Sequence, residues 1–152
     1  MHGVTFPRNS DGWSRHQANT LVHIVNEIAA RDDFPALIEL FTEDCVFRFG
    51  APPEQKGRVA LRQALSGQLL RRKASRLTRS CVAIDGNRLA IRWDGTWTDK
   101  ETGAQMAGFG LEIWTMIGGK IAKLEATFNT REEIAARAPV AATQVPATPV
   151  AA

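Results

Sequence analysis

Three short glycine-containing segments divide the second half of the chain into four long runs of strand-forming residues. The segments are Asp85-Gly86-Asn87, Lys100-Glu101-Thr102-Gly103 and Gly118-Gly119. Glycine supplies the positive φ angles that tight hairpins need. The runs between them, which are rich in β-branched and aromatic residues, cover residues 76–84, 88–98, 105–117 and 121–128. Strands joined by successive hairpins predict an antiparallel meander.

The first half of the chain shows helical periodicity instead. Ser14 and Gln17 match a capping box, and apolar residues follow at helical spacing to about Ala30. Asp33 and Pro35 are typical of a second helix start. Helices followed by a meander indicate an α+β fold with the helices packed on the sheet. Predicted helices cover residues 14–30, 33–41 and 57–73, and a further strand covers 45–49.

The two ends of the chain differ from its middle. Residues 1–13 show no periodicity and predict a flexible arm, whereas residues 138–152 carry three prolines and no charge and predict a disordered tail. One domain over residues 14–137 is expected between them. No apolar run is long enough to cross a bilayer and no signal peptide is recognisable, so we expect a cytoplasmic protein that does not enter membranes. Cys45 and Cys81 are expected to be buried free thiols.

A net charge of +3 says little about partners. The dense basic cluster is Arg71, Arg72, Lys73, Arg76 and Arg79. It begins at a predicted helix end, where cations complement the helix dipole and are solvated. Nucleic-acid binding is the weaker interpretation, because no second basic stretch or exposed aromatic set accompanies the cluster.

Alternation along the strands predicts which residues share a face of the sheet. With each hairpin centred on its glycine-containing segment, one face carries a charged row: Arg79, Arg92, Glu112 and Glu125. The other face is predicted to be apolar and to meet the helices. It carries Val82, Ile84, Leu89, Ile91, Trp93, Trp97, Phe109, Leu111, Ile113, Leu124, Ala126 and Phe128.

Two interpretations of the charged row remain open. It is either a solvated or dimer-facing surface, with cross-strand ion pairs worth about 0.2–1 kcal/mol each, or a catalytic site. In the catalytic interpretation, repulsion between Glu112 and Glu125 raises one pKa for acid–base work, and Arg92 stabilises an anion.

Aromatic side chains on the apolar face are candidates for a ligand pocket of about 300–1,000 Å³. Trp97 and Phe47 fit a core and a pocket wall equally well. His23 lies on the first predicted helix and points either into the fold or to solvent. The candidate ligand-binding residues are Phe47, Phe49, Trp93, Trp97, Phe109, Leu111, Phe128 and His23. The spacing of histidines and carboxylates matches no metal motif, and nothing indicates a cofactor.

Several segments resemble nuclear transport factor 2-like domains, the superfamily of the SnoaL-like polyketide cyclases. They are residues 31–47, Gly57-Arg58, residues 83–93, residues 110–114 and residues 125–129. The resemblance covers about residues 15–130. It implies a cone-shaped, barrel-like α+β fold in which the curved, mostly antiparallel sheet wraps around the first helix. It also implies a pocket at the open end and dimers that pack their sheet faces together.

This sequence departs from the family at two catalytic positions. SnoaL-like cyclases place an acid–base Asp on the last strand, where the resemblance aligns Ala126, and the chain has no Tyr for the phenol donor of ketosteroid isomerase-like members. The resemblance therefore implies a domain that binds a small hydrophobic organic ligand, with cofactor-independent proton transfer as the candidate chemistry. A non-catalytic dimeric interaction module is the alternative.

Overall fold

The computed structural model describes residues 12–133. The helices are α1 (Arg15–Ala30), α2 (Phe34–Glu39) and α3 (Arg58–Arg71). The strands are β1 (Phe41–Phe49), β2 (Gln55–Lys56), β3 (Arg72–Asp85), β4 (Arg88–Asp99), β5 (Gln105–Ile117), β6 (Lys120–Ala126) and β7 (Asn129–Glu132). The tail predicted over 138–152 and most of the predicted arm lie outside the described residues.

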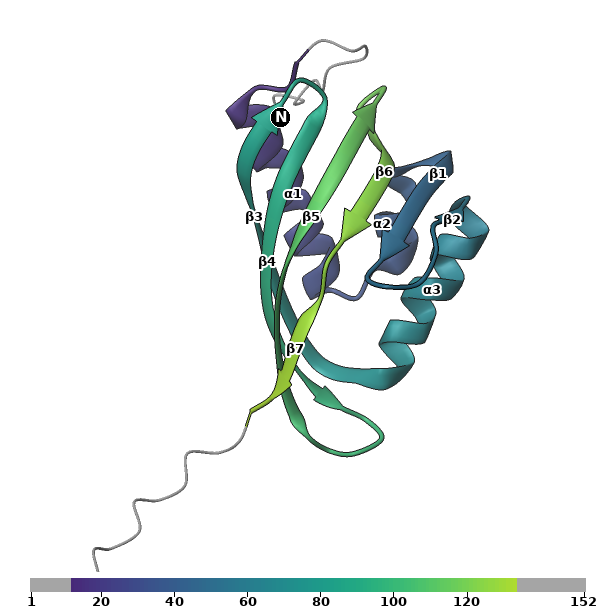
Figure 1. The fold of residues 1–152 in the computed structure, drawn as a ribbon, viewed down its shortest axis with the longest axis vertical. Helices are drawn as coiled ribbons and strands as arrows, with labels where there is room; N and C mark the ends of the chain where they lie inside the picture. Colours follow the sequence, from purple (N-terminus) through teal and green to yellow (C-terminus); the bar gives the residue numbers. More distant parts are fainter. Residues whose placement is uncertain (1–11, 134–152) are drawn as a thin grey trace, which may run out of the picture.

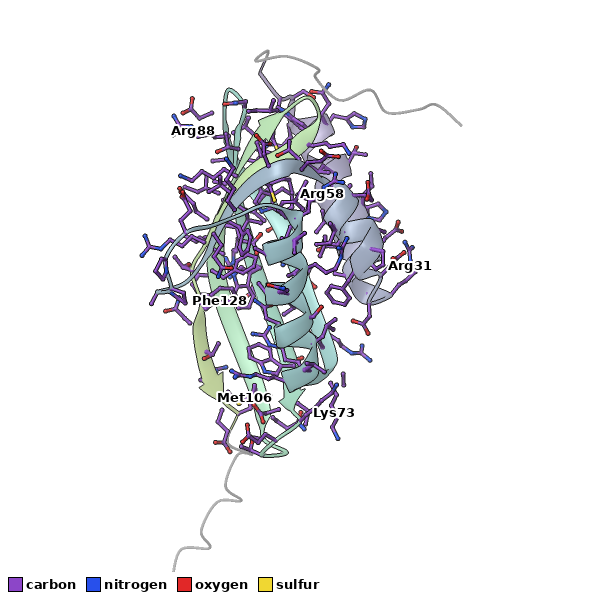
Figure 2. The ribbon with its side chains drawn as sticks, turned by 90° about the vertical axis from the view of Figure 1, so that its right-hand side faces the viewer. Arg31, Arg58, Lys73, Arg88, Met106 and Phe128 are labelled. Atoms are coloured by element: carbon purple, nitrogen blue, oxygen red, sulfur yellow. The ribbon has the colours of Figure 1, made fainter. Side chains whose placement is uncertain are left out.

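The strands form one curved, unclosed sheet with the order β2-β1-β6-β5-β4-β3, and β7 pairs with β5 beyond the end of β6. Only the β1–β6 pair is parallel among the described strands. The helices cover one side of this sheet, and α3 lies next to its β1 edge (Figure 1). A view turned by 90° shows the other side of the sheet without a helix (Figure 2). The predicted α+β class with a mostly antiparallel sheet is confirmed.

The helix α1 begins where the sequence predicts. The Ser14 hydroxyl accepts a hydrogen bond from the Gln17 backbone N–H, and the Gln17 side chain accepts one from the Ser14 N–H. Its apolar stripe, which includes Leu21 and Val25, is buried with strand residues such as Ile91 in one core. Trp13 also belongs to this core, and its N–H donates to the Gly86 carbonyl. The last residue of the segment predicted as an arm is thus packed against the core.

The predicted hairpins of the meander are confirmed. Gly86, Gly103, Gly118 and Gly119 all have φ between 58° and 77°, which L side chains rarely adopt. The β5 range matches the prediction, and the other three predicted strands of the meander are shifted by one to four residues at their ends. The sequence does not predict the two short strands β2 and β7, because two to four residues carry no detectable alternation.

The predicted strand register is wrong, although each hairpin lies at its predicted segment. Ile117 pairs with Lys120 across the Gly118-Gly119 turn, but a bulge between Thr115 and Met116 then shifts the pairing by one residue. A second bulge, between Cys81 and Ala83, does the same in the β3–β4 pair. The β4–β5 loop is centred between residues 101 and 102, so that Glu112 pairs with Ile91 instead of Arg92.

These one-residue shifts divide the predicted charged row between the two faces of the sheet. Because side chains alternate, a shift by one moves a residue to the opposite face. Arg79 and Glu112 lie on the inner face, which meets the helices, whereas Arg92 and Glu125 lie on the outer face, which has no helix. The predicted apolar face is divided as well. Four of its members are exposed instead of facing the helices, namely Val82, Phe109, Leu111 and Ile113.

Candidate functional site

A small cavity of about 60 Å³ lies between the inner face of the sheet and the helices. Its walls are mostly apolar, with Phe49 and Phe128 at one side and Leu65 of α3 at another. Four polar side chains also line it. Arg72, Arg79 and Glu112 come from the sheet, and Gln68 comes from the last turn of α3. The volume falls well below the expected range of about 300–1,000 Å³, and corresponds to about two water molecules.

Glu112 forms the polar centre of this cavity. Its side chain is 5% exposed, and Arg79, with an 18% exposed side chain, donates from Nε to both carboxylate oxygens and from Nη2 to Oε1 at 3.3 Å. The indole Nε1 of Trp114 donates to Oε2 at 2.7 Å. One cation and one neutral donor thus satisfy a carboxylate that is otherwise enclosed by apolar side chains.

Neighbouring elements hold Arg79 in this position. The Asn26 side chain of α1 donates to the Arg79 carbonyl and accepts from the Arg79 N–H, at 3.0 Å and 2.9 Å. This pair of hydrogen bonds attaches α1 to the middle of β3. Because both bonds involve the backbone, the guanidinium of Arg79 stays free to bind Glu112.

The aromatic wall of the cavity depends on two glycines of β5. A Cβ atom at Gly110 would lie 2.1 Å from the Thr127 carbonyl oxygen and 2.4 Å from Trp93 Nε1. A Cβ atom at Gly108 would lie 2.8 Å from the Trp93 ring. Without these side chains the Trp93 indole lies flush against β5, donates to the Thr127 carbonyl at 3.2 Å, and packs against the Phe128 ring.

Three of the predicted ligand-binding residues, Phe49, Trp93 and Phe128, line the cavity. Phe47 is 1% exposed and belongs to the core, and Trp97 is 6% exposed and lies under Arg72 instead of at the cavity wall.

The other predicted ligand-binding residues lie elsewhere. Phe109 and Leu111, which are 41% and 50% exposed, lie on the outer face because of the register shift. His23 also lies outside the cavity. Its side chain is 71% exposed and contacts Glu27 at 3.2 Å, so the solvent-facing interpretation is the correct one.

Two of the three predicted catalytic residues are not brought to Glu112. Arg92 and Glu125 lie on the outer face, where Arg92 pairs with Asp94 at 3.3 Å and Glu125 pairs with Lys123 at 2.8 Å. The proposed repulsion between Glu112 and Glu125 is therefore absent, since the two carboxylates occupy opposite faces. Arg79, which the sequence places in the charged row but not among the catalytic residues, takes the position next to Glu112.

The basic cluster at the end of α3 has two environments. Arg71, Lys73 and Arg76 are exposed, as a solvated helix end predicts, whereas Arg72 is partly buried and its guanidinium lies 4.1 Å from the centre of the Trp97 ring. Burial lowers the pKa of Arg72. The bulge between Lys73 and Arg76 interrupts strict alternation along the strand, and this interruption accompanies the division of the cluster.

The cysteines and the outer face do not contribute to the cavity. Cys45 is buried and Cys81 partly buried, and burial raises the pKa of both thiols. A shallow groove of about 980 Å³ runs over the outer face of β3, β4, β5 and β7, and its polar walls include Arg76, Asp94 and Arg131.

Within residues 12–133, no three His, Cys, Asp or Glu side chains gather as a metal site. No helix in this range is long and apolar enough to span a membrane.

Solved structures share this fold at low sequence identity. A nuclear transport factor 2-like protein of unknown function from Burkholderia pseudomallei has a TM-score of 0.66 at 14% identity, over 77% of this chain and 92% of that one. A proposed polyketide cyclase from Xanthomonas campestris has a TM-score of 0.63 at 21% identity, over 76% and 92%. A proposed isomerase from Bacillus subtilis has a TM-score of 0.62 at 18% identity, over 75% and 87%.

The search of curated proteins gave no match. The family model described as the SnoaL-like domain matches residues 21–124, which is more than half of the chain. Together with the curved sheet and its helices, this match places the molecule in the nuclear transport factor 2-like superfamily. The chain belongs to the SnoaL-like domain family.

Proposed function

We propose that the chain binds a small, mostly apolar organic molecule in the inner cavity and that Glu112 exchanges a proton with it. The observation that carries this proposal is the enclosed Arg79–Glu112 pair on the cavity wall. Glu112 is the only buried charged residue among residues 12–133. A buried ion pair seldom stabilises a fold more than apolar side chains of the same size. A role in binding therefore accounts for the pair better than stability does.

The residues at the cavity define which proton transfer is feasible. Glu112 is the only carboxylate among the cavity residues, and no His or Cys of residues 12–133 accompanies it there. In the proposed step the Glu112 carboxylate takes a proton from a carbon next to a substrate carbonyl. Negative charge then develops on the carbonyl oxygen, while the neutralised carboxyl releases the Arg79 guanidinium to stabilise that charge. Where the substrate has a C=C bond between its β- and γ-carbons, the Glu112 carboxyl returns the proton to the γ-carbon, the double bond moves next to the carbonyl, and the isomerisation is complete without a cofactor.

The position of Glu112 in the sheet supports this role. Ala126, which aligns with the acid–base Asp of the family's cyclases, is the direct partner of Glu112 across the β5–β6 pair. Ala126 is 8% exposed and Glu112 is 4% exposed, so both are buried on the inner face of the sheet. Glu112 thus places a carboxylate on the strand next to the one that carries the Asp in the cyclases.

Entry of a ligand larger than the cavity requires a wall to move. We propose that α3 is this wall, because Leu61 is its only buried residue and Leu65 and Gln68 line the cavity from it. A helix with one buried anchor separates from its neighbours more readily than the helix α1, which has five buried residues.

A ligand-observed NMR screen tests the proposal, using small cyclic ketones and phenols as probes. Binding is expected for the wild type and to be lost in Leu65→Trp, which fills the cavity from α3. Ketones that bind are then incubated in D2O, and exchange of their α-protons is expected to fall at least about 100-fold in Glu112→Gln. Glu125→Gln, the matched change on the outer face, is expected to leave exchange unchanged. Equal exchange in both variants would contradict the role of Glu112.

The alternative of a dimeric interaction module is supported by a separate observation on the outer face. Phe109, Leu111, Ile113 and Ile117 alternate along β5 and are 41% to 61% exposed. Charges of both signs flank this apolar stripe, with Arg92 and Asp94 on β4 and Lys123 and Glu125 on β6. We propose that a second copy of the chain covers the stripe, since a two-fold interface can match each charge with its opposite.

Sedimentation velocity tests this assembly. Ile113→Asp is expected to convert a dimer into a monomer, whereas Val59→Asp, at an apolar residue of α3 that is 68% exposed, is expected to leave the dimer intact. A monomeric wild type would contradict the assembly. A dimer that binds no probe from the screen would favour the interaction module over the ligand-binding function.

A further inference from the structure

Arg72 lines the inner cavity and is held there by an aromatic ring. It follows the last residue of α3 and begins β3, and its guanidinium lies 4.1 Å from the centre of the Trp97 ring. Trp97 is 6% exposed, so the ring is a fixed support for the cation. The neighbouring Lys73 lies at the same end of the molecule as Met106, opposite the end with Arg88 (Figure 2).

Arg72 has no anionic partner within residues 12–133. It makes no ion pair and no side-chain hydrogen bond there, in contrast to Arg79 and Arg58. Its Cα partner across the sheet is Asp99, but that carboxylate accepts hydrogen bonds from the N–H groups of residues 101 and 102 in the β4–β5 turn. A contact with an aromatic ring consumes no N–H, so the five donors of Arg72 remain available.

The charge of the cavity is consequently unbalanced. Two guanidiniums, Arg72 and Arg79, and one carboxylate, Glu112, enter the cavity, and Glu112 is committed to Arg79. One positive charge is left without compensation in a partly buried place. Gln68, one helical turn before Arg72, adds a polar amide to the lining of the same space.

We infer that the ligand of the inner cavity carries a carboxylate, which Arg72 binds while the apolar body lies against Phe49, Trp93 and Phe128. This inference rests on the proposed ligand-binding function and names its ligand class. A single negative charge matches the single uncompensated cation, and a planar carboxylate fits the fork of guanidinium N–H donors. The Arg79 guanidinium offsets the charge of Glu112, so that repulsion of the ligand carboxylate by Glu112 is reduced.

Paired probes that differ only in charge test the inference. Cyclohexanecarboxylate and benzoate are each compared with their primary amides by NMR titration of the full chain at neutral pH. The acids are expected to bind about tenfold more tightly than the amides, because a hydrogen bond to a charged partner contributes more than a neutral one. The preference is expected to weaken as salt concentration rises.

Variants at Arg72 connect the preference to this residue. Arg72→Gln is expected to abolish the preference while amide binding persists, and Arg72→Lys is expected to retain part of it. Arg76→Gln removes a neighbouring charge that lines only the outer groove, and is expected to change nothing. Thermal melting of each variant identifies any that fails to fold, and Arg72→Lys then replaces Arg72→Gln in the comparison.

Each outcome separates this inference from the function on which it rests. Amide binding that Leu65→Trp blocks, with no advantage for the acid, overturns the carboxylate and leaves the binding function standing. A preference that survives in Arg72→Gln assigns the anion to another cation and overturns the role of Arg72. If neither acid nor amide binds the wild type, the carboxylate inference is overturned, and the screen of ketones and phenols decides whether the binding function stands.

Discussion

The two faces of the sheet carry similar residues in different environments. Glu112 and Glu125 lie on neighbouring strands, yet Glu112 is enclosed with Arg79 and Trp114 while Glu125 is half-exposed beside Lys123. Leu89 is fully buried on β4 while Leu111 is 50% exposed on β5. Residue type alone therefore does not decide the role of a side chain here. The role depends on which face of the sheet the side chain occupies, and the register of the strands determines that face.

The largest expected difference between the faces concerns their arginines. Arg79→Ala leaves the Glu112 charge enclosed without a cation, so we expect a loss of about 3–5 kcal/mol in the free energy of unfolding. Arg92→Ala breaks an exposed pair with Asp94, for which at most about 1 kcal/mol is expected. Urea denaturation of both variants measures the two losses. Equal losses would show that Glu112 is not held by Arg79.

Leucines on the two faces give a second, purely apolar comparison. Leu89→Ala removes a side chain with no exposed surface and is expected to cost about 2–5 kcal/mol. Leu111→Ala is expected to change the free energy of unfolding by about 0.5 kcal/mol or less. Denaturation is measured at low protein concentration, so that self-association through the outer face does not add to the second value. A large loss in Leu111→Ala under those conditions would place that residue in the core.

The glycine under Trp93 tests how closely the inner face is packed. A methyl group at Gly110 would meet the Thr127 carbonyl and the Trp93 indole nitrogen, so Gly110→Ala is expected to cost about 1–3 kcal/mol. A methyl group at Gly67 of α3 would have no neighbouring atom within 4 Å, and Gly67→Ala is expected to stabilise the chain by up to about 1 kcal/mol. Opposite signs in thermal melting support this packing, and a neutral Gly110→Ala would contradict it.

The smallest expected effect concerns the turn that sets the β4–β5 register. Hydrogen bonds from the backbone N–H groups of Thr102 and Glu101 lower the pKa of Asp99 below its ordinary value of 3.8. A lowered pKa in the folded state means that Asp99 stabilises the chain fully above about pH 3.8 and loses this contribution as pH falls further. Asp99→Ala is therefore expected to lower Tm at neutral pH.

The difference in Tm between Asp99→Ala and the wild type is expected to narrow at about pH 3. Asp85→Ala serves as the matched control, because Asp85 also flanks a hairpin but only forms an exposed pair with Arg88 at 3.7 Å. A Tm difference for Asp99→Ala that is constant with pH would show that its carboxylate charge does not matter to the turn.

Much of the fold follows from local signals in the sequence. The capping box at Ser14 and the glycines at residues 86, 103, 118 and 119 act over a few residues, and their helix and hairpins form where predicted. The bulges at 81–83 and 115–116 do not have such a signal, because they depend on how each strand packs against its neighbours. Each bulge moves every residue beyond it to the opposite face.

The candidate site depends on those bulges and on where the β4–β5 loop is centred, and it follows from the sequence only in part. Glu112, Trp93 and Phe128 can be recognised, since a carboxylate and aromatics within a meander suggest a site in any register. The partner of Glu112 cannot be recognised from the sequence, because the strand register decides whether Arg79 or Arg92 lies next to it. From the sequence, Arg72 is expected in a solvated cluster. Its contact with Trp97 gives no local signal, because the two residues lie 25 positions apart in the chain.

The phenyl ring of Phe128 connects the two sides of the sheet. Phe128 lies where β6 has ended and β7 has not begun, and it lines both the inner cavity and the outer groove. One side chain thus borders a hollow on each side of the sheet. Shortening it would enlarge both hollows at once, so Phe128 links the size of the inner cavity to the shape of the outer surface.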